Sequence, residues 1–163
     1  MSPAGNVTTL PEKGVRPVFK IVVVGTDGSS TADKAVESAA GIARTLNAKL
    51  HVVTAYKGGS GISAATGAAA GAALVDTGAG HAVAEESAKG VLDRAVESYG
   101  SGLDVSTHVV HADPVDAILS TAAEVGADLI VVGSKGMHRR ILGSVPNSVA
   151  HSAECSVFIA KTD

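Results

Sequence analysis

Short apolar runs alternate along the chain with longer stretches in which apolar residues recur every three or four positions. The runs cover residues 19–25 (FKIVVVG), 50–55 (LHVVTA), 105–110 (VSTHVV), 128–133 (DLIVVG) and 156–160 (SVFIA). Short runs rich in β-branched residues are typical of strands that are buried on both faces of a sheet. We therefore predict five strands, separated by four segments with helical periodicity.

The first two helical segments combine this periodicity with recognisable ends. Ser30 can cap the first helix, and the buried side of that helix is predicted to consist of Ala32, Ala35, Val36, Ala39, Ala43 and Leu46. A second helix is predicted from His81, and Gly100 would end it, because glycine readily adopts the backbone conformation that terminates helices.

The last two helical segments also begin at capping residues. Asp113 and Pro114 form a strong helix start, as cap and first helical residue, and Gly126 would end this third helix. Ser144 can cap a fourth helix that runs to about Ala153.

Strand and helix thus alternate four times before a final strand, which places the chain in the α/β class. Alternation at this spacing predicts a parallel sheet with helices on both faces. In such sheets, ligands bind beyond the carboxyl ends of the strands, where neighbouring strands send their connections to opposite faces. A ligand site is therefore expected at that edge.

Two segments lack periodic structure. Residues 1–16 mix proline, glycine and charge, and we interpret them as a flexible tail before one domain at residues 17–163. Residues 57–80 consist almost entirely of glycine, alanine, serine and threonine. Such a composition buries too little to offset its ordering entropy, so a mobile loop is expected there.

Composition and charge narrow the function classes. Hydrophobic residues make up 45% of the chain and aromatic residues 2%, so the core must be built from aliphatic side chains. The net charge of −3 gives no electrostatic reason to expect nucleic acid or an anionic membrane as a partner. Cys155 is the single cysteine and is interpreted as a core residue. Without a recognisable signal peptide or membrane-length apolar run, a reducing cytoplasm is the expected compartment.

Polar, glycine-containing turns follow two of the predicted strands. They are Gly25-Thr26-Asp27-Gly28-Ser29 and Gly133-Ser134-Lys135-Gly136. Glycine lets backbone amides approach a phosphate with no Cβ in the way. If the first and fourth strands are neighbours, both turns line one crevice.

A third segment, Gly143-Ser144-Val145, opens a predicted helix, and the unpaired amides and dipole of a helix start attract anions. Four basic side chains precede it, namely Lys135, His138, Arg139 and Arg140. Asp27 can accept hydrogen bonds from ribose hydroxyls. Together, these features predict a site for a nucleotide or a similar phosphorylated ligand.

Each feature taken singly also has a structural explanation. Gly133 and Gly136 can serve a tight turn, Ser144 can cap its helix, the arginine pair can be a solvated face, and Asp27 can cap its own loop. Their combination at strand ends that are predicted to adjoin favours a site. The sequence carries no Walker A motif, no strand-linked GxGxxG motif, no GxSxG motif and no zinc-ligand spacing of its histidines.

The segments VVVGTDGSSTADKAVESAAGIA, ADPVDAI, ADLIVVGSKGM and RRILGSVPNSVAHSAECSVFIAK resemble the universal stress protein family, and most closely its single-domain actinobacterial members. The resemblance covers residues 19–161 except much of the Gly/Ala-rich loop. It implies a three-layer, doubly wound fold of the adenine nucleotide alpha hydrolase-like type. The implied sheet has five parallel strands in the order 3-2-1-4-5, with four helices.

The nucleotide-binding branch of that family carries the pattern G-x2-G-x9-G-[ST] after the fourth strand. Here Gly133 and Gly136 match its first part and Gly143-Ser144 its second, and the resemblance implies that these residues hold phosphates. It also implies that Asp27 contacts ribose, that Ala55 offers its backbone to the base, and that Thr26 and Val132 flank adenine and sugar.

The sequence departs from this pattern at two places. Only six residues, 137–142, separate Gly136 from Gly143, whereas the pattern has nine. The shorter loop would change how these glycines are placed around a triphosphate. Arg139 and Arg140 can compensate, since arginine suits phosphate oxygens. Ala112 stands where a glycine is usual, and we expect this change to be mild.

We therefore expect a protein that holds ATP or cyclic AMP, with or without magnesium, and that senses or sequesters the nucleotide in a stress response. Turnover is expected to be very slow at most. A dimer paired through residues 156–160 is expected too, because an apolar edge strand invites pairing with its copy. Two alternatives stay open: a dimeric interaction module that binds no nucleotide, and a true ATPase or phosphotransferase.

Overall fold

The computed structural model describes residues 18–57, 79–134 and 142–162. Its five strands are β1 (Ile21–Gly25), β2 (Lys49–Tyr56), β3 (Val105–His111), β4 (Leu129–Gly133) and β5 (Ser156–Ala160). They pair in parallel in the order β3-β2-β1-β4-β5, which confirms the predicted sheet. The strand ends differ from prediction mainly at β1, where the amides of Lys20 and Ile21 donate to the Asp128 carboxylate at 2.8 and 3.0 Å before the strand ladder begins.

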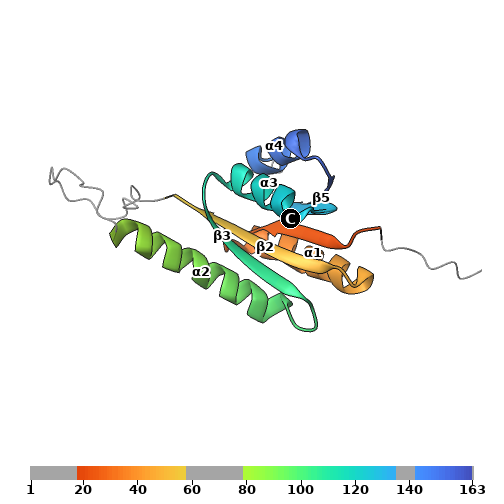
Figure 1. The fold of residues 1–163 in the computed structure, drawn as a ribbon, viewed down its shortest axis with the longest axis horizontal. Coiled ribbons are helices and arrows are strands. Elements are labelled where there is room, and N and C mark those ends of the chain that lie inside the picture. Colours follow the sequence, from red (N-terminus) through yellow and green to blue (C-terminus); the bar gives the residue numbers. More distant parts are fainter. Residues whose placement is uncertain (1–17, 58–78, 135–141, 163) are drawn as a thin grey trace, which may run out of the picture.

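Four helices connect the strands: α1 (Ser30–Leu46), α2 (Ala79–Tyr99), α3 (Pro114–Val125) and α4 (Ser144–Ser152). Figure 1 shows α3 and α4 together on one side of the sheet and α2 along the other. α1 packs on the same face as α2. No helix within the described ranges combines the length and the apolar composition needed to cross a membrane.

Successive strand residues point to opposite faces, and the sheet therefore carries two cores. Val22 and Val24 of β1 pack with Val36 and its neighbours on α1 and with Leu92 on α2. Val23, between them, packs on the other face with α3 and α4. The aliphatic composition is what makes these strands suitable for burial on both sides.

Two predicted helix caps are wrong by one residue. Ser29, not Ser30, caps α1, and its Oγ accepts from the Ala32 amide at 3.3 Å. Gly143, not Ser144, is the cap position of α4. In both places two adjacent residues can serve as a cap, and the local sequence does not distinguish them.

The other helix ends agree with the sequence. Asp113 caps α3, Pro114 is its first residue, and Gly126 ends it with a φ of 66°. α2 begins at Ala79, two residues before the predicted start, and ends at Tyr99, directly before Gly100. Residues 79 and 80 of the predicted loop therefore belong to α2, whereas residues 58–78 and the predicted tail lie outside the described residues.

Candidate functional site

A pocket of about 210 Å³ lies beyond the carboxyl ends of β1 and β4. β1 leads into α1, which covers one face of the sheet, and β4 precedes α4, which covers the other. This is the switch point at which α/β sheets bind ligands. The predicted crevice beyond the ends of β1 and β4 is thus present in the described part of the chain, with the first glycine turn and Gly133 in its lining.

The lining of the pocket is mixed in chemistry. Its apolar residues are Ala32, Val53, Ala55, Pro114, Ala117, Ile118, Val132, Val145 and Pro146, and the remainder are Gly25, Thr26, Asp27, Ser29, Thr31, Gly133, Gly143 and Ser144. A largely apolar cavity with a few polar groups and glycines is the usual composition of a small-molecule site.

The turn between β1 and α1 is held by its own polar side chains. The Thr26 hydroxyl accepts from the Gly28 amide at 3.2 Å, and the Asp27 Oδ1 accepts from the Ser29 amide at 3.0 Å. The loop-capping role considered for Asp27 is therefore real. A carboxylate offers about four acceptor positions, and Asp27 is exposed at the pocket.

Gly25, the last residue of β1, is required by the close approach of α3. A Cβ at this position would lie 2.5 Å from Ile118 Cδ1. Ile118 itself is buried and lines the pocket. The glycine thus lets α3 pack against the end of β1 and form one wall of the pocket.

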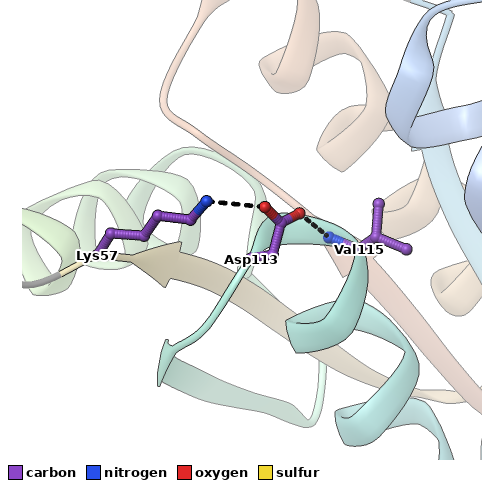
Figure 2. A network of polar contacts seen from close by, with 3 residues as sticks. All are labelled: Lys57, Asp113 and Val115. Atoms are coloured by element: carbon purple, nitrogen blue, oxygen red, sulfur yellow. Dashed lines mark hydrogen bonds and ion pairs between the residues drawn. The ribbon is translucent and has the colours of Figure 1, made fainter.

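The start of α3 is joined to the end of β2 by an ion pair (Figure 2). Lys57 Nζ donates to Asp113 Oδ2 at 2.9 Å, while Asp113 Oδ1 accepts from the Val115 amide at 3.4 Å. The hydrogen bond from Lys57, and then that from Val115, lowers the pKa of Asp113, and the same contact raises the pKa of Lys57. The pair connects the carboxyl end of β2 to Pro114, a pocket residue.

The start of α4 presents backbone groups to the pocket. No described side chain forms a capping hydrogen bond at Gly143. Amides in the first turn of a helix have no partner within the helix, and Ser144 and Val145 both line the pocket. These amides are placed to bind an anion, which the positive end of the helix dipole favours.

The structure places many of the predicted site residues in one pocket: Thr26, Asp27, Ala55, Val132, Gly133, Gly143, Ser144 and Val145. The other predicted residues, Lys135, Gly136, His138, Arg139 and Arg140, lie outside the described residues. Within the described ranges, no group of three or more His, Cys, Asp or Glu side chains is arranged to hold a metal ion.

Sequence reasoning missed the wall that α3 contributes. Pro114, Ala117 and Ile118 occupy the first turns of this helix and line the pocket. A signal for them exists, because the strand before α3 ends at the same edge of the sheet as β1 and β4. Lys57 and Asp113 could have been found in the same way, because they follow the neighbouring parallel strands β2 and β3, which end at this edge of the sheet.

Comparison with known proteins agrees with the fold. The sequence model of the universal stress protein family matches residues 19–161. A universal stress protein of Mycobacterium tuberculosis is 36% identical over 150 residues, which cover 88% of this chain and 97% of the relative.

Solved structures are similar as well. The crystal structure of a universal stress protein in complex with cAMP is 33% identical, with a TM-score of 0.66, and the match covers 89% of this chain and 98% of that one. A universal stress protein from Archaeoglobus fulgidus is 26% identical, with a TM-score of 0.63 and coverage of 86% and 93%. The fold is thus of the adenine nucleotide alpha hydrolase-like type, as the resemblance implied.

Proposed function

The chain belongs to the universal stress protein family, and on this premise we propose that its pocket binds an adenine nucleotide. The observation that carries the proposal is how the pocket lining is distributed across the sheet. Val53 and Ala55 of β2 lie on one side of β1, together with the apolar start of α3. Gly133 of β4 and the start of α4 lie on the other side.

This distribution fits a mononucleotide. Neighbouring strands are about 4.8 Å apart, so β2 and β4 are separated by roughly 10 Å, a span suited to a base at one side and a phosphate at the other. The apolar lining beside Ala55 suits a purine. The amides of Ser144 and Val145 suit a phosphate, and Asp27 between them suits ribose hydroxyls.

The ligand is ATP or cyclic AMP, and the protein senses or sequesters it in a stress response. The similar protein solved in complex with cAMP supports the cyclic nucleotide. The shortened segment of residues 137–142 also favours a ligand with one phosphate over a triphosphate. Magnesium would be required only for the triphosphate, whose charge it neutralises.

The proposal includes the oligomeric state of the protein and its compartment. The protein acts as a cytoplasmic homodimer formed by residues 17–163 and paired through residues 156–160. The support for pairing is that β5 is an edge strand whose Phe158 side chain is 44% exposed, a combination that invites association.

Calorimetric titration with cyclic AMP, AMP and ATP, the last with and without magnesium, tests nucleotide binding. Ala32→Leu fills the pocket from α1 and should weaken binding at least about tenfold. The matched control is Ala123→Leu on the exposed side of α3, which should leave the Kd unchanged.

Two results would contradict nucleotide binding in this pocket. One is a Kd weaker than about 1 mM for every nucleotide, which corresponds to only about −4 kcal/mol, and in a protein that still dimerises this result favours the interaction module. The other is unchanged affinity in Ala32→Leu, which would place the nucleotide outside the pocket that Ala32 lines. Phosphate release well above ~0.1 s⁻¹ would instead favour an ATPase, since ordinary enzymes turn over at ~1–10³ s⁻¹.

A further inference from the structure

Thr162, two residues beyond β5, contacts the residue that directly follows β4. The Thr162 amide donates to Ser134 Oγ at 3.1 Å, and the two hydroxyl oxygens are 3.3 Å apart. The Ser134 amide in turn donates to the Ala160 carbonyl at 2.9 Å. Lys34 Nζ on α1 donates to the Thr162 carbonyl at 3.1 Å. The chain after β5 is therefore fixed to both β4 and α1.

This contact is buried and lies directly behind the pocket. Ser134 is 2% exposed and Thr162 is 7% exposed. Gly133, which precedes Ser134, lines the pocket. A Cβ on Gly133 would lie 3.3 Å from Thr162 Cγ2 and 3.2 Å from the Thr31 carbonyl oxygen. Gly133 is thus held between Thr162 and the first turns of α1, with little room to move.

We propose that Thr162 is a positioning residue for the phosphate of the bound nucleotide. Thr162 does not line the pocket; it fixes Ser134 and, through it, Gly133, which does line the pocket. The inference rests on the proposed function, because it assigns the phosphate to the side of the pocket formed by Gly133 and the start of α4.

The physical reason is the cost of removing a partner from a buried hydroxyl. In Thr162→Val the Ser134 Oγ still accepts from the Thr162 amide but loses its contact with the Thr162 hydroxyl. A shift of Ser134 that relieves this loss also shifts Gly133, its neighbour in the chain. A glycine displaced by a fraction of an ångström no longer presents its backbone correctly to a phosphate oxygen, because hydrogen bonds depend steeply on distance and angle.

The test measures how much the phosphate adds to affinity. Adenosine and AMP are titrated into each variant by NMR. The Kd of adenosine divided by the Kd of AMP gives the contribution of the phosphate to affinity. Thr162→Val removes the hydroxyl at nearly constant volume and should reduce this ratio about fivefold to tenfold. Ser134→Ala removes both side-chain contacts and should reduce it at least as much. Adenosine affinity should stay unchanged in both variants.

Two further variants separate positioning from general stability. Thr162→Ser keeps the hydroxyl and should retain the wild-type ratio. Thr121→Val makes the same substitution at another buried threonine, on α3 and outside the pocket lining, and should leave the ratio unchanged even if it lowers Tm. Circular dichroism confirms that each variant is folded.

The outcomes distinguish this inference from the function on which it rests. If wild-type protein binds AMP but the ratio is unchanged in both Thr162→Val and Ser134→Ala, the positioning role is wrong. An equal loss of adenosine and AMP affinity also overturns it, because that result indicates general loosening of the fold. A wild-type protein that binds neither compound contradicts the proposed function itself, and this inference with it.

Discussion

His51 Nδ1 and His108 Nε2 lie 2.8 Å apart on the neighbouring strands β2 and β3, and their rings stack at 5.1 Å. One proton between these nitrogens makes a hydrogen bond, whereas a proton on each of them would produce repulsion. His51 is 6% exposed. Burial lowers its pKa, and His108 and Lys49 lower it further, while Asp104 acts in the opposite direction. The fold therefore favours the neutral form of His51.

We predict that this pair makes the protein less stable in mild acid. Because the pKa of His51 is lowered in the folded state, the unfolded chain binds more protons near and below pH 6.5. The contribution of neutral His51 to the unfolding free energy is complete above pH 6.5 and is lost as the pH falls through the lowered pKa of His51. Urea unfolding at several pH values between 7.5 and 5 measures this change in the unfolding free energy.

His51→Leu removes the titrating group and should flatten the dependence of the unfolding free energy on pH in this window. His151→Gln, on the exposed surface of α4, serves as the control and should keep the wild-type profile. The carboxylates with a lowered pKa, Asp113 and Glu85, act at lower pH and do not interfere. Parallel profiles for wild type and His51→Leu would show that the pair has no such effect.

The contact between Gly25 and Ile118 predicts a double-mutant cycle. Gly25→Ala places a Cβ 2.5 Å from Ile118 Cδ1, and such overpacking typically costs about 1–3 kcal/mol of unfolding free energy. Ile118→Ala leaves a cavity and should cost about 2–5 kcal/mol. In the double variant the new methyl occupies part of that cavity, so the cost should be at least about 0.5 kcal/mol below the sum. Strict additivity would contradict the close approach of α3.

The sequence predicts the parts of this fold that depend on local chemistry. Strands β1, β2 and β4 are recognisable because burial on both faces requires continuous apolar runs, whereas β3 and β5 are only partly buried. Asp113-Pro114 and Gly126 mark the ends of α3 because only a few residue types satisfy those backbone positions. The glycine turns after β1 and β4 are recognisable too, and they led to the edge of the sheet at which the pocket lies. The strand order came from family resemblance.

The sequence predicts poorly what depends on distances between elements. Ser29 and Ser30 are equally able to cap α1, and the backbone geometry selects Ser29. The need for glycine at residue 25 arises from a helix more than 80 positions away along the chain, so no local pattern reveals it. The contact between Ser134 and Thr162 likewise joins two polar residues with no motif around them.

Asp27 gives a prediction about the sugar. If its carboxylate binds ribose hydroxyls, Asp27→Asn should weaken AMP binding about tenfold, since hydrogen bonds to a charged group are worth about 1.5–3 kcal/mol. Asparagine can still accept from the Ser29 amide through Oδ1, which preserves the turn. Affinity for 2′,3′-dideoxy-AMP should be unchanged, because this analogue lacks both hydroxyls.

Titration of both compounds into Asp27→Asn and into the control Asp93→Asn, on the exposed side of α2, provides the comparison. The control should bind both as wild type does. An equal loss for AMP and the dideoxy analogue in Asp27→Asn would mean that the carboxylate acts on the turn or the phosphate and not on ribose.

The exposed edge of β5 predicts how the chain assembles. Strand pairing through residues 156–160 in a second copy would cover Phe158, which stands on the edge strand of the described sheet. Light scattering coupled to gel filtration at micromolar concentration should therefore give twice the 16.1 kDa of one chain.

Phe158→Lys should shift the protein to the mass of one chain, because a lysine on an edge strand opposes pairing of two copies. Val83→Lys is the matched control: Val83 is 71% exposed on α2, away from the edge strand, and the variant should remain dimeric. Both variants should retain the wild-type circular dichroism spectrum, since neither side chain is part of a core. A dimer that persists in Phe158→Lys would place the interface elsewhere, because burying a charge without a partner in the strand pairing is strongly destabilising.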